Sequence, residues 1–313
     1  MIKFHLNLVP ANGHVKPYEI PFGYTFQSVI FGWLHEHHPR LLHELHSYER
    51  VRPYSINCYI HKNMPKVEFT IVSYEQQLST ALLDIITPQK GKSMTVAQKE
   101  YIIEDLNIES VKPTVLFHRA KPVKHFHIQF ATPCHFNTIH GDYPVRFPMP
   151  DELFGNVLTL WKMMAKNVGK NPIELNQQNF RAWINAHMYA SSFKMRSASY
   201  FIQREKQVAG GQRFVAYRIT PLDEYYYCRR YNKNKNSLSP SEKTEATRDY
   251  LTRCRCVEFL ARLGEYTNVG GHRTAGMGVI RYFPKAYRDS DELNINININ
   301  GSISNPMAPN PHK

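Results

Sequence analysis

Residues 270–278 have the sequence GGHRTAGMG, which contains four glycines and is the stretch that decides the fold. A helical pattern over residues 247–263 precedes it, and a short strand pattern over residues 279–283 follows it. A Walker loop has the opposite order, strand before helix, and needs Lys-Ser or Lys-Thr where Met277 and Gly278 stand here. A dinucleotide fingerprint is excluded by the same order. Two interpretations remain: a flexible backbone that approaches an anion, or a tight turn that packs the last helix on a sheet.

The charge of the chain indicates its kind of partner. The 313 residues carry a formal charge of +13, and 12% of them are aromatic. A basic, aromatic-rich body favours a nucleic acid, and an anionic membrane surface is the weaker alternative. The first eight residues alternate too regularly for a signal peptide, and no apolar run reaches the ~18 residues of a membrane span. The five cysteines form no CxxC pair, so we expect free thiols and a cytoplasmic protein.

Outward from the glycine-rich segment, the chain shows one pattern of elements twice. In the first half the order is strand, helix, strand, strand, helix, strand, with a short extra helix opened by Pro39. This order is that of a ferredoxin-like unit. The elements are expected at residues 2–9, 25–38, 53–60, 67–72 and 76–86, with a further pair of short strands within 94–103.

The second half repeats the order less clearly. Its elements are a strand at 125–131, a helix at 151–164, a hairpin of strands 194–203 and 213–219, the helix at 247–263 and the last strand. Gly210 and Gly211 are expected at the turn of the hairpin. Residues 232–245 and the tail from Asp289 are expected to be disordered, because they contain few large apolar residues or are of low complexity. We therefore predict an α+β protein with two tandem ferredoxin-like units, joined near residues 113–122.

Five stretches, in order, carry a resemblance to a known family. They are HLNLVP (5–10), LLHELHSYERVRPYSIN (41–57), TPCHFNT (132–138), FPMPDELFGNVLTLW (147–161) and LGEYTNVGGHRTAGMGVIR (263–281). Together they resemble the CRISPR-associated repeat-RNA endoribonucleases of the RAMP superfamily, whose C-terminal signature is a helix, a glycine-rich turn and Gly-Met/Phe-Gly at a last strand.

This resemblance implies both the domains and the reaction. It implies an N-terminal ferredoxin-like domain (1–122), a C-terminal ferredoxin-like domain with the basic hairpin and the glycine-rich loop (123–285), and a disordered tail (286–313). It also implies cleavage of CRISPR precursor RNA within its repeats without a metal or other cofactor. The ribose 2′-OH is then the nucleophile, and the products carry a 2′,3′-cyclic phosphate and a 5′-OH.

The resemblance also implies the catalytic residues. His46 matches the family's catalytic histidine at the end of a short helix, and His43, one turn earlier, is the next candidate. Arg52 matches a basic residue that assists catalysis; an arginine can hold a phosphate oxygen but cannot act as an acid at neutral pH. Some members have a catalytic tyrosine where Phe31 stands, so the acid stays open between His43, Tyr48 and water.

The expected RNA contacts lie in the C-terminal domain. They are Gly270, Gly271, His272, Arg273, Gly276 and Gly278 of the loop and Lys194, Arg196, Arg204, Lys206 and Arg213 of the hairpin. A solvated charged face is the alternative for the hairpin. The partner is CRISPR repeat RNA, as precursor and as processed guide, and effector-complex subunits are further possible partners.

Three alternatives remain open. His35, His38, His43 and His46 could suggest a metal site, but Pro39 separates the two pairs and no Cys, Asp or Glu completes a ligand spacing, so no metal is expected. A non-catalytic RAMP subunit that only binds guide RNA would share the fold and the loop. A basic module for membrane surfaces or general nucleic acids would explain the charge but not the ordered motifs.

Overall fold

The computed structural model describes most of the chain. It covers residues 1–12, 23–47, 51–60, 67–96, 98–136, 145, 147–166, 175–202, 205–222 and 239–284. The expected disorder of the tail and of residues 232–238 lies outside these ranges, as do Tyr48 and Arg204. Within the described ranges, no helix has the length and apolar character needed to cross a membrane.

The first half forms a five-stranded antiparallel sheet with the order β2-β3-β1-β5-β4. Its central strand, β1 (Ile2–Pro10), pairs with β3 (Val67–Ser73) and β5 (Lys99–Ser110). The edge strands are β2 (Tyr54–Ile60) and the short β4 (Ser93–Val96). Because β1 alternates buried and partly exposed residues, Phe4, Leu6 and Leu8 all face one core.

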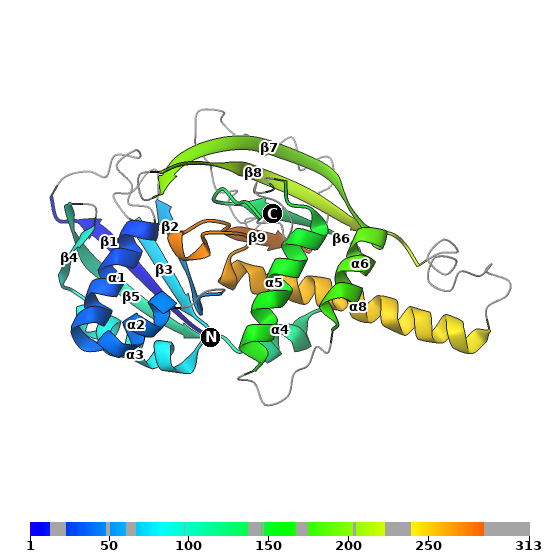
Figure 1. The fold of residues 1–313 in the computed structure, drawn as a ribbon, viewed down its shortest axis with the longest axis horizontal. Coiled ribbons are helices and arrows are strands. Elements are labelled where there is room, and N and C mark those ends of the chain that lie inside the picture. Colours follow the sequence, from blue (N-terminus) through cyan, green and yellow to red (C-terminus); the bar gives the residue numbers. More distant parts are fainter. Residues whose placement is uncertain are drawn as a thin grey trace, which may run out of the picture.

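Three helices cover this sheet, as Figure 1 shows in blue and cyan. They are α1 (Gly23–His37), α2 (Pro39–Ser47) and α3 (Gln76–Ile86), followed by a 3-10 turn, η1 (Thr87–Gln89). Phe26 of α1 stacks on Phe69 of β3, with the ring centroids 4.2 Å apart. The helices and strands of the first half agree with the sequence pattern, and the pair of strands near residue 98 continues to Ser110.

The second half forms a four-stranded antiparallel sheet with the order β7-β8-β6-β9. Its strands are β6 (His125–Phe130), β7 (Met188–Ile202), β8 (Glu205–Ile219) and β9 (Ile280–Phe283). Three helices pack on it: α5 (Pro150–Ala165), α6 (Gln177–His187) and the long α8 (Pro240–Thr267). In each sheet the first strand of its half, β1 or β6, therefore lies in the interior, and the second strand, β2 or β7, lies at an edge.

The hairpin differs from its predicted form. Gly210 and Gly211 lie inside β8, opposite Ser197 and Arg196 of β7, and the chain turns between Ile202 and Glu205. The prediction of a turn at the glycines was wrong because an isolated glycine pair is a strong turn signal, whereas here the pairing on both sides of it continues the strands. Each strand is 15 residues long.

The start of α8 also corrects the prediction. Residues 240–245 were expected to be disordered, yet they form the first turns of the helix. Ser239 and Glu242 make a capping box, in which each side chain bonds the other residue's backbone N–H. The polar composition of this stretch marks a capped, exposed helix end. Residues 113–122, expected to be a joint, contain a helix, α4 (Pro113–Arg119).

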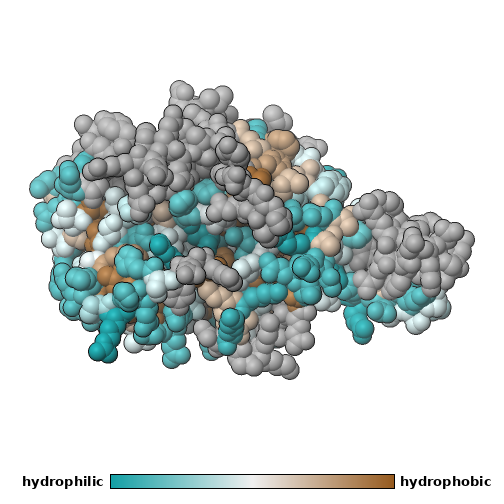
Figure 2. All heavy atoms as spheres, in the orientation of Figure 1, coloured by the Kyte–Doolittle hydropathy of each residue, from teal (hydrophilic) through white to brown (hydrophobic). Residues whose placement is uncertain are grey.

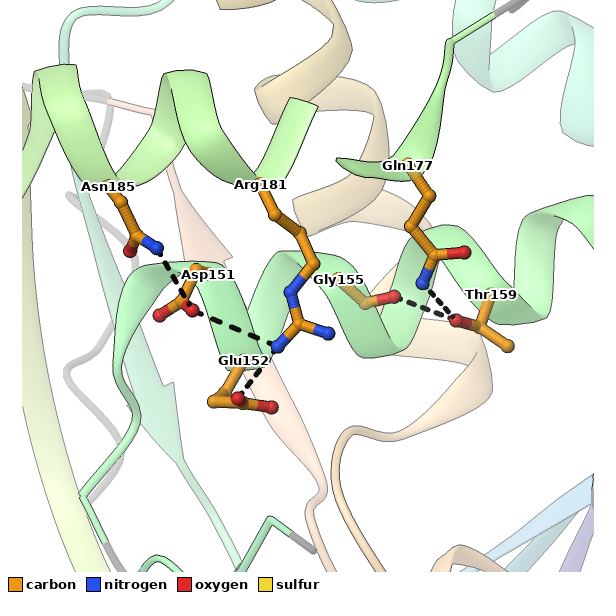
Figure 3. A network of polar contacts seen from close by, with 7 residues as sticks. All are labelled: Asp151, Glu152, Gly155, Thr159, Gln177, Arg181 and Asn185. Atoms are coloured by element: carbon orange, nitrogen blue, oxygen red, sulfur yellow. Dashed lines mark hydrogen bonds and ion pairs between the residues drawn. The ribbon is translucent and has the colours of Figure 1, made fainter. Parts of the chain in front are cut away.

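The sequence pattern did not predict α6, and polar contacts hold it on α5. Figure 3 shows Arg181 between Asp151 and Glu152, with its guanidinium 2.7 Å from the Glu152 carboxylate. Gln177 donates to the Thr159 hydroxyl at 2.9 Å. A Cβ at Gly155 would lie 3.1 Å from the Arg181 side chain. These contacts fix the first turn of α5, where the segment 145–149 enters it.

Candidate functional site

The glycine-rich segment joins the two halves of the molecule. It follows the end of α8, contains a 3-10 turn, η3 (Arg273–Ala275), and leads into β9. A Cβ at Gly23, the first residue of α1, would lie 2.9 Å from the backbone of Ala275 and of Gly276. The side chain of Asn268 donates to the Ile56 carbonyl of β2 at 3.0 Å. The segment therefore closes on α1 and β2, although more than 200 residues separate them in sequence.

The backbone N–H groups of the four glycines are used within the protein. Gly271 donates to His135 O and Gly278 to Pro133 O, both at 2.8 Å, and Gly270 donates to the Asn156 side chain at 3.0 Å. Gly276 donates to Arg273 O at 3.3 Å. A phosphate cradle needs N–H groups that point at the ligand. The glycines thus serve close packing, which was the second interpretation of the sequence.

Arg273 lies inside the joint, which corrects its expected place on an RNA surface. Its side chain is 9% exposed and donates to Thr267 O at 3.1 Å. Burial lowers the pKa of Arg273, and the neighbouring hydroxyl of Tyr74 opposes this effect. The sequence could not separate Arg273 from its neighbour His272, which is exposed and has a left-handed backbone with φ 51°.

His46 lies at the end of α2 with its side chain exposed. Its imidazole makes an edge contact with the Phe31 ring of α1, at a centroid distance of 5.2 Å. The Phe31 ring in turn lies 6.1 Å from the ring of Tyr54 at the start of β2. The structure thus brings the predicted histidine and the residue at the family's tyrosine position together. It also extends the row to Tyr54, which the sequence analysis did not assign.

The other end of this row lies at the joint. The Tyr54 hydroxyl accepts a hydrogen bond from the Gln27 amide of α1. Burial raises the pKa of Tyr54, while the charge of Arg52 and hydrogen bonds from Gln27, Arg52 and Thr274 oppose the rise. Arg52 and Thr274 therefore meet at one phenol, although one precedes β2 and the other belongs to the C-terminal segment. Arg52 and Tyr54 are two residues apart along an extended chain, and this spacing could have pointed to Tyr54.

A pair of histidines completes the site. The rings of His135 and His272 lie 5.2 Å apart. Burial and the neighbouring His272 lower the pKa of His135 to about 4. Burial and the charge of Arg52 lower the pKa of His272. Arg52 therefore acts electrostatically on both His272 and Tyr54.

The predicted cations of the basic hairpin that the structure describes lie on β7 and β8. Lys194 on β7 is exposed, and Arg196, Lys206 and Arg213 lie on the paired strands, opposite Gly211 in the case of Arg196.

His43 is exposed on α2, and His38 lies 3.8 Å from the Asp84 carboxylate. Among the described residues, no three His, Cys, Asp or Glu side chains are grouped to hold a metal ion. Within the described part of the chain, Cys58, Cys134, Cys254 and Cys256 form no disulfide bond.

Comparisons with known proteins give a consistent result. A family model described as "CRISPR-associated endoribonuclease Cas6" matches residues 128–280. No curated protein sequence matches the chain. The fold is similar to that of a Cas6 product complex, with a TM-score of 0.67 and 14% identity over 90% of this chain and 99% of that one.

Two further structures share the fold. A Cas6 from Thermus thermophilus has a TM-score of 0.61 and 14% identity, over 90% of this chain and 98% of that one. A protein described as Cas6-related, from Pyrococcus furiosus, has a TM-score of 0.52 and 12% identity, over 91% of this chain and 99% of that one. At these identities the likeness is one of fold, and it spans nearly the whole of each relative.

Proposed function

Because the chain belongs to the Cas6 family of CRISPR-associated endoribonucleases, we propose that it cuts repeat-containing CRISPR RNA at the site where His46, Arg52 and the C-terminal segment meet. Each sheet with its helices is then one ferredoxin-like domain, 1–122 and 123–285. Related structures are described as a Cas6 product complex and a Cas6 substrate mimic complex, which supports an RNA substrate. One observation carries the proposal: an exposed histidine lies at one end of an aromatic row whose other end is held by an arginine.

The reaction needs no group outside the protein and the RNA. The 2′ oxygen attacks the adjacent phosphorus, and the bond from phosphorus to the 5′ oxygen breaks. The products are a 2′,3′-cyclic phosphate and a 5′-OH. One proton leaves the 2′-OH and one proton joins the 5′ oxygen, so a base and an acid are required, each contributing ~10²–10⁴-fold.

The side chains at the site suit these roles. His46 is exposed, and an imidazole nitrogen can take the 2′-OH proton as a general base. Arg52 holds a non-bridging phosphate oxygen, because its planar guanidinium stays charged throughout the reaction. The Tyr54 hydroxyl, which also bonds Thr274, holds Arg52 in place. Phe31 cannot transfer a proton and instead fixes the imidazole of His46 by its edge contact.

For the leaving 5′ oxygen we assign His272 as the acid. Burial and the charge of Arg52 lower its pKa, so a phosphate that neutralises Arg52 would raise this pKa and favour the protonated form that an acid needs. His43 is the alternative, but it lies one helical turn before His46, away from the strand that Arg52 precedes. Lys194 and the other cations of the hairpin bind the phosphates of the repeat. This part of the binding is expected to weaken with salt.

The test is cleavage of the chain's own repeat RNA in EDTA. We expect cutting to persist and to leave a cyclic phosphate, and a requirement for Mg²⁺ would contradict the mechanism. Replacing the 2′-OH at the cut with hydrogen should abolish cutting while binding is kept. Binding without cutting of the all-ribose RNA would instead identify a RAMP subunit that carries guide RNA.

A further inference from the structure

An exposed apolar patch lies where β7 passes the entry to α5. It consists of Phe147, Met149, Phe193 and Met195, which we call the β7 patch. Phe193 is 56% exposed, Met149 45% and Met195 41%. The rings of Phe147 and Phe193 meet edge to face, with the centroids 5.2 Å apart. Figure 2 shows apolar colour gathered over the place where β7 runs in Figure 1.

A β-bulge creates this patch. Met188 and Ala190 of β7 pair with Ile219 and Tyr217, whose side chains are buried under the helices. Regular alternation would next place residues 192 and 194 on that side. The register shifts between Ala190 and Ser192, however, so that Phe193 pairs with the buried Val215. The inserted residue reverses the alternation, so Phe193 lies on the helix side and the exposed Lys194 on the other, and the register shifts again between Lys194 and Met195.

The neighbourhood holds the rings in place. The Tyr217 hydroxyl donates to Pro148 O at 2.7 Å, and Met149 N donates to Phe147 O at 2.8 Å. Val145 and Phe136 exchange two backbone hydrogen bonds at 2.8 Å. Because Met149 caps α5, the contacts of α5 with α6 in Figure 3 also hold this segment. Phe193 is therefore supported by the Phe147 ring while more than half of its surface stays exposed.

The size and charge of the surroundings favour an RNA base over a protein. A stable protein interface takes ~800 Å² and 20–30 residues on each side, far more than four side chains offer. An unpaired base needs one aromatic ring to stack on and a cation for its phosphate. Phe193 and Lys194 are consecutive on an edge strand, so a strand of RNA along that edge can place a base on one side and a phosphate on the other.

We propose that Phe193, supported by Phe147, is a stacking site for an unpaired base that flanks the stem of the bound repeat. The proposal rests on the proposed RNA substrate and adds to it a place where sequence can be recognised. Paired A-form RNA is recognised largely by its shape, whereas unpaired bases can be stacked and identified one at a time.

The experiment uses the full chain and repeat RNAs in which 2-aminopurine replaces one unpaired base at a time. Stacking on Phe193 is expected to change the fluorescence at one position on binding. The change should be lost in Phe193→Ala and Phe193→Leu and kept in Phe193→Tyr. We expect Phe193→Ala to weaken binding ~10-fold, within the range of base–aromatic stacking. The control Leu251→Ala removes a 40% exposed apolar side chain on α8 and should change neither property.

Each other outcome has a definite meaning. If Phe193→Leu behaves like the original chain, or no position responds while RNA still binds and is cut, the stacking site is refuted and the proposed function stands. If the chain neither binds nor cuts repeat RNA, both proposals fail. If Phe193→Ala instead changes the oligomeric state in light scattering while leaving RNA affinity unchanged, the β7 patch is a contact between copies and the stacking site is refuted. Melting temperatures of all variants show that they fold.

Discussion

At the scale of single residues, the two proton transfers can be separated by their substrates. A sulfur atom in place of the 5′ oxygen leaves without a proton. His272→Ala should therefore cut the oxygen substrate ~10²–10⁴-fold more slowly and the sulfur substrate near the original rate. His46→Ala should be slow on both, because the 2′-OH still needs a base.

Matched variants make this comparison clear. His37→Ala removes an exposed histidine at the end of α1 and should leave both rates unchanged. Measured single-turnover rates on the two RNAs decide the assignment. If His46→Ala cuts the oxygen substrate at the original rate, the base is another group. If His43→Ala, and not His272→Ala, is rescued by sulfur, then His43 is the acid.

Three glycines differ in what a methyl group would meet. At Gly278, φ is 67° and a Cβ would lie 1.7 Å from Val269 O, so Gly278→Ala should destabilise by more than ~2 kcal/mol. Gly91 has φ 79° and open space, so Gly91→Ala should cost only ~1–2 kcal/mol. Gly32 lies in α1 with open space, and Gly32→Ala should stabilise by ~0.5–1 kcal/mol. Urea unfolding would show any departure from this order.

His135 predicts a dependence of stability on pH. Burial holds its pKa at about 4 in the folded protein, below the ordinary histidine value of ~6.5. The unfolded chain binds the proton more readily, so the free energy of unfolding should fall as the pH drops from ~6.5 to 4. In His135→Gln this fall should be smaller, by up to about 3 kcal/mol. Equal slopes for the two proteins in urea titrations would exclude His135 as the cause.

At the scale of elements, the start of α8 offers a direct test. Ser239→Ala removes one half of the capping box and should cost ~1 kcal/mol in the first turn of the helix. Hydrogen exchange of the Glu242 amide, which donates to the Ser239 hydroxyl at 3.2 Å, should accelerate. Ser28→Ala, within α1 and exposed, is the control that should change nothing. Unchanged protection at Glu242 would show that the cap does not hold this end.

The elements also show what the sequence could and could not predict. Strongly periodic segments such as β1 and α3 were predicted close to their bounds, because their burial follows their own apolar spacing. A turn was wrongly predicted at Gly210–Gly211 and the helix α6 was not predicted, since the pairing of β7 with β8 and the ion pairs to α5 decide them. For the same reason His46 could be placed on a helix end, whereas the meeting of Tyr54, Thr274 and Arg52 depends on contacts across the whole chain.

At the scale of the whole molecule, the joint should make the two halves unfold together. Ser55 of β2 donates to Tyr266 O at 2.7 Å, and Asn268 bonds both Ile56 and Arg273. The three tryptophans allow a test, because Trp33 lies in the first half and Trp161 and Trp183 in the second. Replacing Trp33 by Phe leaves the fluorescence of the second half, and replacing Trp161 and Trp183 by Phe leaves that of the first half.

We expect both fluorescence transitions to coincide in urea, as a single cooperative unfolding requires. Asn268→Ala removes the bond to Ile56 across the joint, together with the bond to Arg273 that shapes the segment, and should separate the midpoints. Thr80→Ala, an exposed change within α3, should leave them together. Separate midpoints in the unaltered chain would show that the halves unfold independently.

The packing of Gly23 against Gly276 also bears on the synthesis of the protein. At ~5–20 residues per second, a ribosome completes the first sheet and its helices well before it adds the segment that closes on α1. A nascent chain can thus carry His46 and Arg52 together with Phe31 and Tyr54, but without Thr274 and His272. If the proposed function holds, the site is complete only once the C-terminal segment has been made, and we expect shortened chains not to cut RNA.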